Sequence, residues 1–103
     1  MRGMAFGGLV LEALADSERT SRGLGVGDLA LFVKHVGQYG IHAVAKGAGF
    51  QKDDVIVAID GLAKRLGEGQ LLGYLLQSHQ PGEKIEATVL RGTLRVALNL
   101  PMQ

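Results

Sequence analysis

The spacing of apolar and polar positions divides the chain into short segments, most of them ended by glycine. Apolar runs at 29–36 and 55–59 predict buried strands, because large and β-branched residues fill them and turn-forming residues flank them. Alternating apolar positions at 85–89 and 94–100, separated by an Arg-Gly-Thr turn, predict a β-hairpin. A short apolar strand at 9–11, reached through a glycine-rich loop, is predicted near the start of the chain.

Helical periodicity is confined to a few places. The segment Glu68 to Ser78 predicts a helix that stops before Pro81-Gly82. A helical turn or two is expected at 42–46, and the polar stretch 16–22 can start a short helix before a run of glycines ends it. The 16 glycines favour short strands and tight turns over a helical bundle.

Size and charge restrict the class of protein. The 103 residues, 47% apolar and 20% charged, fit a single domain spanning 1–103, which we expect to be a piece of a longer protein. A net charge of +1, with the basic residues scattered along the chain, argues against nucleic acid as the main partner. No apolar run is long enough to predict a membrane span, and no signal sequence is recognisable.

Residues for catalysis or metal binding are present but form no motif. There is no cysteine, so no disulfide, thiolate nucleophile or cysteine zinc site is expected. His35 and His42 flank a glycine loop but lack a third ligand, and the glycines at 23–27 lack the Lys-Ser/Thr of a phosphate loop. None of the serines lies in a nucleophile motif, and Asp28 and Asp53-Asp54 suit turns. The sequence therefore predicts a non-catalytic domain with no cofactor and no metal.

Two segments resemble a known family. Residues 43–61 read Ala-Val-Ala-Lys-Gly-Ala-Gly-Phe-Gln-Lys-Asp-Asp-Val-Ile-Val-Ala-Ile-Asp-Gly, and residues 81–92 read Pro-Gly-Glu-Lys-Ile-Glu-Ala-Thr-Val-Leu-Arg-Gly. They resemble the PDZ domains of bacterial HtrA-type proteases, in which a short helix ending in Ala-Gly-Leu leads into Gly-Asp-Val-Ile and a strand ending in Asn/Asp-Gly. Asp53 stands where the family usually has glycine, and aspartate tolerates the left-handed conformation better than most residues.

The resemblance implies a fold and a place for a ligand. The expected fold is α+β, mainly β and PDZ-like: a small, partly open β-barrel or sandwich of about five or six strands capped by two α-helices. The family's carboxylate-binding loop corresponds to Phe6-Gly7-Gly8-Leu9, whose backbone N–H groups would hold a free carboxylate. The strand continuing through Val10 and Leu11 would have an unpaired edge, where an extended peptide can add as a further strand.

The helix opposite would supply the second wall of the groove. Its leucines form two pairs about 100° apart, so only one pair faces the groove. The resemblance favours Leu72 and Leu76, with Gly73 between them, and Leu71 and Leu75 are the alternative. This wall is apolar and lacks the histidine with which some PDZ domains select serine or threonine. The expected ligand is a hydrophobic polypeptide C-terminus.

Alternatives remain open at each step. The glycine-rich loop can be a simple start to the first strand, the leucines can all belong to the core, and Arg2 can be a solvated charge or can support the carboxylate from behind the loop. The domain can serve as a stand-alone peptide-binding module, as a regulatory or substrate-presenting part of a larger HtrA-type serine protease, or only as a packing element with an occluded groove. The family resemblance alone suggests the cell envelope or periplasm.

Overall fold

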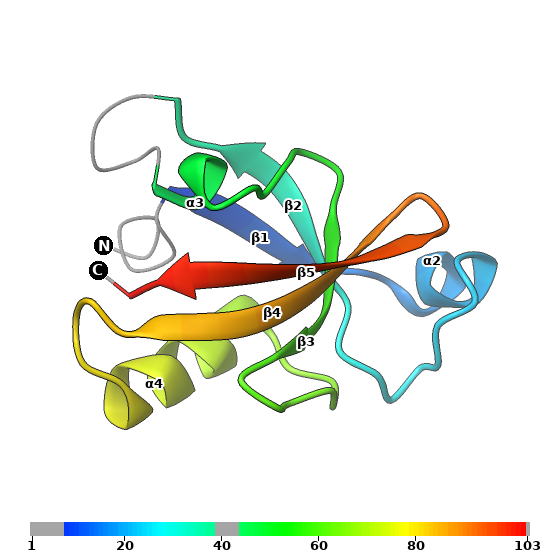
Figure 1. Cartoon of the computed structure of the whole chain (residues 1–103). Coiled ribbons are helices and arrows are strands. Elements are labelled where there is room, and N and C mark those ends of the chain that lie inside the picture. Colours follow the sequence, from blue (N-terminus) through cyan, green and yellow to red (C-terminus); the bar gives the residue numbers. More distant parts are fainter. Residues whose placement is uncertain (1–7, 39–43, 103) are drawn as a thin grey trace.

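The structure, a computed structural model, describes residues 8–38 and 44–102. Five strands form one antiparallel sheet in the order β1-β2-β3-β4-β5. The strands are β1 (Leu9–Ala13), β2 (Leu31–Val36), β3 (Val55–Ile59), β4 (Lys84–Arg91) and β5 (Leu94–Pro101), and the helices are α2 (Asp16–Ser21), α3 (Val44–Gly47) and α4 (Glu68–Ser78). In Figure 1, α3 and α4 lie toward the left of the view, and α2 lies at the right.

The predicted α+β, mainly β class is confirmed, and so are the individual strands of the hairpin and the long helix. In the part of the chain described, β1 and β5 do not pair, so the sheet stays open rather than closing into a barrel. The polar stretch at 16–22 forms α2, which makes three helices among the described residues instead of the two expected. The pairing register shifts between Val10 and Leu11 and between Ile56 and Ala58, and such irregularities bend a sheet.

The core has two parts because successive strand residues point to opposite faces of the sheet. The larger part joins β1 to β5 with α3 and α4, and its most deeply buried large side chains are Leu9, Leu29, Leu31, Phe50, Ile56, Ile59, Leu71, Leu75, Ile85 and Leu100. The smaller part lies on the other face and comprises Leu14, Leu24, Ala30, Val55 and Val57. Burial of both faces explains why the run at 55–59 is continuously apolar rather than alternating.

An ion pair between a partly exposed arginine and a buried aspartate joins the two segments that carry the family resemblance. The Nε and Nη2 atoms of Arg91, at the end of β4, donate to the two carboxylate oxygens of Asp54 at 2.9 and 2.8 Å. Nη2 of Arg91 also donates to the carbonyl of Gly49, and the backbone N–H of Gln51 donates to Asp54. Asp54 is 1% exposed, so its charge is neutralised inside the domain. The preceding residue, Asp53, adopts a φ of 74°, the left-handed conformation expected for it.

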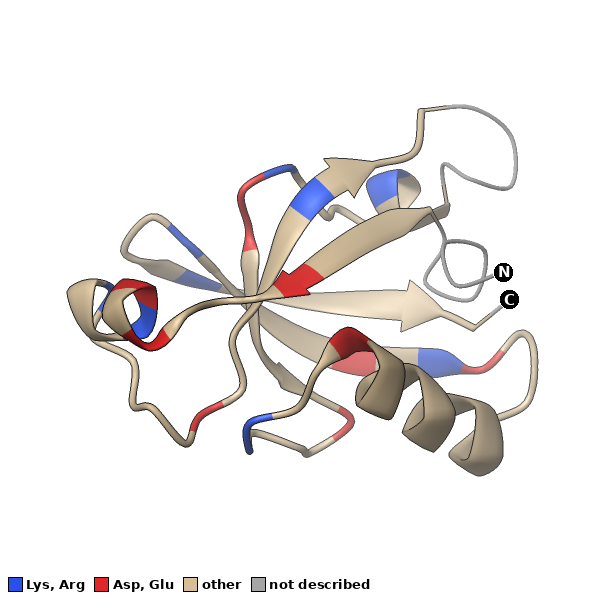
Figure 2. Cartoon of the chain, turned by 180° about the vertical axis from the view of Figure 1, so that it is seen from behind, with Lys and Arg blue, Asp and Glu red and all other residues tan. Residues whose placement is uncertain are grey.

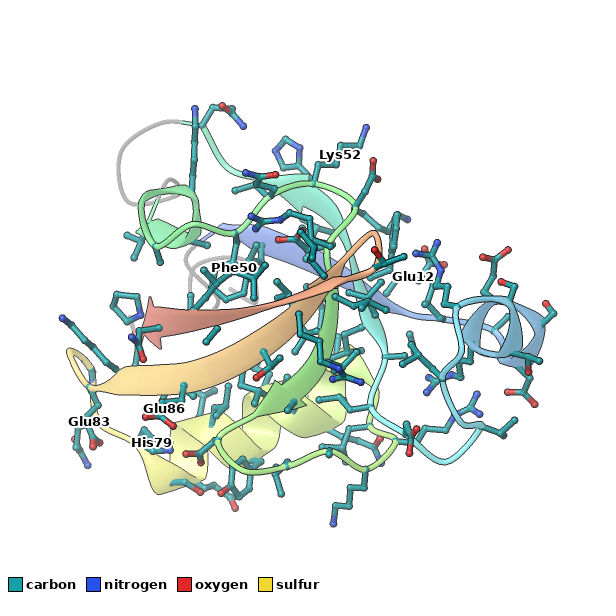
Figure 3. The ribbon with its side chains drawn as sticks, turned by 45° about the vertical axis from the view of Figure 1, so that its right-hand side comes forward. Glu12, Phe50, Lys52, His79, Glu83 and Glu86 are labelled. Carbon is teal, nitrogen blue, oxygen red and sulfur yellow. The ribbon has the colours of Figure 1, made fainter. Side chains whose placement is uncertain are left out.

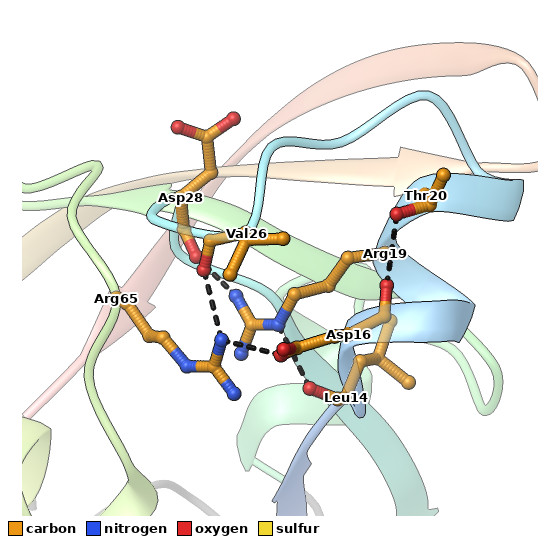
Figure 4. A network of polar contacts seen from close by, with 7 residues as sticks. All are labelled: Leu14, Asp16, Arg19, Thr20, Val26, Asp28 and Arg65. Atoms are coloured by element: carbon orange, nitrogen blue, oxygen red, sulfur yellow. Dashed lines mark hydrogen bonds and ion pairs between the residues drawn. The ribbon is translucent and has the colours of Figure 1, made fainter.

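A buried cation fixes α2 to the rest of the domain (Figure 4). Arg19 is fully buried, with Nε donating to the Leu14 carbonyl at 2.8 Å and Nη1 donating to the Asp28 carbonyl. Burial lowers the pKa of Arg19, and the neighbouring charge of Arg65 lowers it further. Arg65 in turn bonds Asp16 at 2.7 Å. This network holds the end of β1, α2 and the following loop together.

Candidate functional site

One edge of β1 faces α4 rather than another strand. β1 pairs with β2 along one side only, within the residues described. On its other side the backbone N–H of Leu11 donates to Oε2 of Glu68, the first residue of α4, at 3.0 Å. The side chains of Leu9 and Leu11 are buried, whereas that of Val10 is 43% exposed. The free edge therefore presents backbone groups toward the helix, as strand addition requires.

The leucines of α4 divide between the core and the surface. Leu71 and Leu75 are fully buried, so the pair considered as the alternative groove wall belongs to the core. Leu72 is half-buried against the same core, and Leu76 is 55% exposed. Positions 68, 72 and 76 share one side of a helix because they are four residues apart. The helix side whose Glu68 contacts β1 thus carries the two more exposed leucines.

Gly73 is exposed on the same helix. A Cβ atom added there would meet no atom within 4 Å, so packing does not require a glycine at this position. Glycine in a helix interior costs about 1 kcal/mol relative to alanine. Its role in the predicted groove stays a prediction.

The predicted carboxylate loop lies mostly outside the described residues. Arg2, Phe6 and Gly7 precede the first described position, and their roles stay predictions. Gly8 is buried with a φ of 94°, and its carbonyl accepts a hydrogen bond from the N–H of Gly37 at 3.1 Å. A side chain at Gly8 would be strained in this conformation, which matches the expected glycine-dependent start of β1.

A polar cluster fixes the C-terminal end of α4 to the turn after β3. Oδ2 of Asp60 accepts hydrogen bonds from the hydroxyl of Tyr74 at 2.9 Å and pairs with Nε2 of His79 at 2.8 Å. The hydrogen bond between His79 and Asp60 raises the pKa of His79 and lowers the pKa of Asp60. Nδ1 of His79 lies 3.6 Å from Glu83, and Figure 3 shows the two side chains near each other beside the end of α4. The cluster positions the helix that faces β1.

Two hollows of the described surface lie away from the β1–α4 edge. One, of about 400 Å³, lies over β3, β4 and β5 and is lined by short side chains such as Ala58, Thr88 and Ala97. Another, of about 390 Å³, lies beside α3 and includes Lys46 and Lys52. Acidic and basic residues are interspersed along the ribbon, as Figure 2 shows, and no group of metal ligands occurs among the residues described. Neither hollow contains a cluster suited to catalysis.

The fold and the β1–α4 arrangement define the class: the chain is a PDZ-like domain resembling those of HtrA-type proteases. Among solved structures, a serine-to-alanine variant of the HtrA-type protease AlgW with a decapeptide is 28% identical, with a TM-score of 0.73 over 93% of this chain. AlgW with a decapeptide is 29% identical over 92% of this chain with a TM-score of 0.63, and AlgW with a tripeptide is 28% identical over 91% with a TM-score of 0.65.

The three matches cover 27%, 27% and 29% of the respective AlgW chains, so this chain spans little more than a quarter of their length. No protein-family model matches the sequence, and no curated protein matches it either. None of the helices in the described ranges is both long enough and apolar enough to cross a membrane.

Sequence reasoning missed two residues at this site. Glu68 was assigned only as the start of the helix, although its spacing of four from Leu72 places it on the predicted groove side. His79 was assigned no role from the sequence, but its ring is half-buried and bonds Asp60. Its contact joins positions 19 residues apart, which no local pattern indicates.

Proposed function

We propose that this chain is a non-catalytic peptide-recognition domain that binds the C-terminal end of another polypeptide. The observation that carries the proposal is the edge of β1, where the Leu11 N–H contacts the start of α4, the helix that carries the exposed Leu76. An extended peptide added to this edge gains main-chain hydrogen bonds, and its side chains contact the helix. The solved AlgW structures with a decapeptide or a tripeptide support the assignment of a peptide as ligand.

The chemistry of the two walls favours an apolar ligand end. After Glu68, α4 carries no charged residue, and its side toward β1 offers Leu72 and Leu76. The backbone N–H groups of the predicted loop, Phe6 to Leu9, would hold the terminal carboxylate without a charged side chain, and Arg2 would support it. The terminal side chain would then pack against the leucines.

The test is a binding comparison with short fluorescent peptides ending in Leu, Val or Phe, each made with a free carboxylate and as an amide. Free-carboxylate peptides should bind more tightly than the matching amides, because only they place a full negative charge against the loop donors. A peptide ending in Asp serves as the control for apolar selection. Equal binding of the free and amidated forms would contradict end recognition, and absence of binding by every peptide would favour a packing element.

A second candidate follows from the length covered in the comparisons. Because the chain matches little more than a quarter of each protease, it can be the regulatory or substrate-presenting part of a larger HtrA-type serine protease. Such a protein would carry a Gly-x-Ser-Gly-Gly motif upstream in the same gene. Its protease activity should then change when an apolar C-terminal peptide is added, since the bound peptide would shift the conformational balance.

A further inference from the structure

One backbone donor on the free edge of β1 is already occupied. On an edge strand, every second residue directs its N–H and C=O outward, and a ligand strand pairs with those groups. The N–H of Leu11 is such an outward group, and it donates to the Glu68 carboxylate at 3.0 Å across 57 positions of sequence. Any peptide that extends along β1 as far as Leu11 must take the place of this carboxylate.

The contact is favourable in the free domain for three reasons. A carboxylate accepts a stronger hydrogen bond from a backbone N–H than a neutral carbonyl does. Glu68 is the first residue of α4, where the helix dipole stabilises a negative charge. The bond is partly buried and Glu68 is half-buried, so water competes with it less than at an open surface.

We propose that Glu68 is an internal competitor for the peptide-binding edge of β1, so that ligands bind only by displacing it. This proposal rests on the proposed function, because it concerns the same edge. A ligand carbonyl replaces a charge-assisted hydrogen bond with a neutral one, and the free energy difference weakens every peptide that reaches Leu11. Glu68 therefore sets a threshold that admits only ligands with enough additional contacts at the leucines and the carboxylate loop.

Two substitutions at Glu68 separate the effect of side-chain length from the effect of side-chain charge. Glu68→Asp keeps the charge at the start of α4 but shortens the side chain by about 1.5 Å, enough to break the contact with Leu11. Glu68→Gln keeps the reach but replaces the carboxylate with an amide, which accepts a weaker hydrogen bond. Glu86→Gln, on the exposed side of β4, removes one negative charge far from β1 and is the matched control.

The first measurement needs no ligand. Amide hydrogen exchange at Leu11 should quicken about tenfold or more in Glu68→Asp, less in Glu68→Gln, and not in Glu86→Gln, because only the first loses the acceptor. Unchanged exchange at Leu11 in Glu68→Asp would overturn the proposal, since the carboxylate would then not be holding that donor.

The second measurement is the affinity for the tightest free-carboxylate peptide of the fluorescent series. Glu68→Asp should bind it about threefold to tenfold more tightly than the unmodified domain, which is the range expected from removing one competing charge-assisted hydrogen bond. Glu68→Gln should fall between them, and Glu86→Gln should match the unmodified domain. Faster exchange without tighter binding would make Glu68 a brace between α4 and β1 and would overturn the competitor role.

The outcomes distinguish this proposal from the proposed function. Binding of equal strength by the unmodified domain and Glu68→Asp leaves peptide recognition intact and refutes the competitor. Binding by Glu68→Asp alone supports both, as the extreme case of competition. Absence of binding by all four proteins refutes both, since no ligand is then available to be excluded.

Discussion

The exposed Leu76 allows a sharp test of the predicted groove, because its neighbour Leu75 is fully buried on the same helix. We expect Leu76→Ser to weaken peptide binding while leaving the domain folded. Full burial of a leucine side chain is worth about 1.5–3 kcal/mol. Leu76 is 55% exposed. A ligand that covers the exposed part therefore gains about 1 kcal/mol, which corresponds to about a fivefold change in dissociation constant.

The matched variant Leu75→Ser should act on stability instead. Loss of a fully buried leucine costs about 2–5 kcal/mol, and a buried hydroxyl adds to this cost, so we expect about 4 kcal/mol. Leu76→Ser should lower the free energy of unfolding by only about 1 kcal/mol, from lost helix propensity and partial burial. Urea denaturation followed by circular dichroism measures both values, and fluorescence anisotropy with a free-carboxylate peptide measures binding.

Two results would refute this reasoning. If Leu76→Ser unfolds as readily as Leu75→Ser, then Leu76 is a core residue and cannot contact a ligand. If Leu76→Ser remains folded and binds every peptide as the unmodified domain does, then the exposed leucine side of α4 is not the ligand wall.

Three further predictions concern stability and the helix. Asp54→Ala should lower the free energy of unfolding by about 1–3 kcal/mol, since it removes the charge-assisted hydrogen bonds from Arg91 and the bond from the Gln51 N–H, and urea denaturation measures this loss. The pairing of His79 with Asp60 should stabilise the domain most between about pH 4 and 6.5. Because the pKa of His79 is raised, the stabilisation by His79 is full below pH 6.5 and is lost as the pH rises through the pKa in the folded state. Because the pKa of Asp60 is lowered, the stabilisation by Asp60 is full above pH 3.8 and is lost as the pH falls through the pKa in the folded state. Melting temperatures measured across this pH range should show the dependence. In His79→Gln, the fall in melting temperature at the upper end of the range should be smaller. Gly73→Ala should stabilise the domain by about 0.5–1 kcal/mol, because the added methyl group meets open space, and weaker peptide binding by this variant would place position 73 in the groove.

Local patterns predicted the elements that depend on local physics. The helix Glu68–Ser78 has the bounds expected from its leucine spacing and from Pro81-Gly82, and β3 coincides with the run at 55–59. The hairpin was also predictable, since its alternation and its Gly92 turn are both visible in the sequence. These assignments needed no knowledge of how distant segments meet.

Contacts between segments that are distant in the sequence could not be predicted from local patterns. Arg19 belongs to a polar stretch of the sequence, yet its side chain is completely buried and bonds the carbonyl of Leu14. The bond from Leu11 to Glu68 depends on where α4 crosses the end of β1, and helical spacing alone cannot give that position. The same holds for the open sheet, because whether β1 meets β5 depends on the twist and irregular pairing of all five strands.

The Asp54–Arg91 pair has a consequence for synthesis on the ribosome. A nascent chain that ends before residue 91 contains β1, β2 and β3, but it lacks the guanidinium that bonds both carboxylate oxygens of Asp54. The turn before β3 therefore cannot reach its final set of hydrogen bonds until β4 has been made. We expect the Asp54–Arg91 pair to close late in synthesis, when the β4–β5 hairpin becomes available to pair with β3.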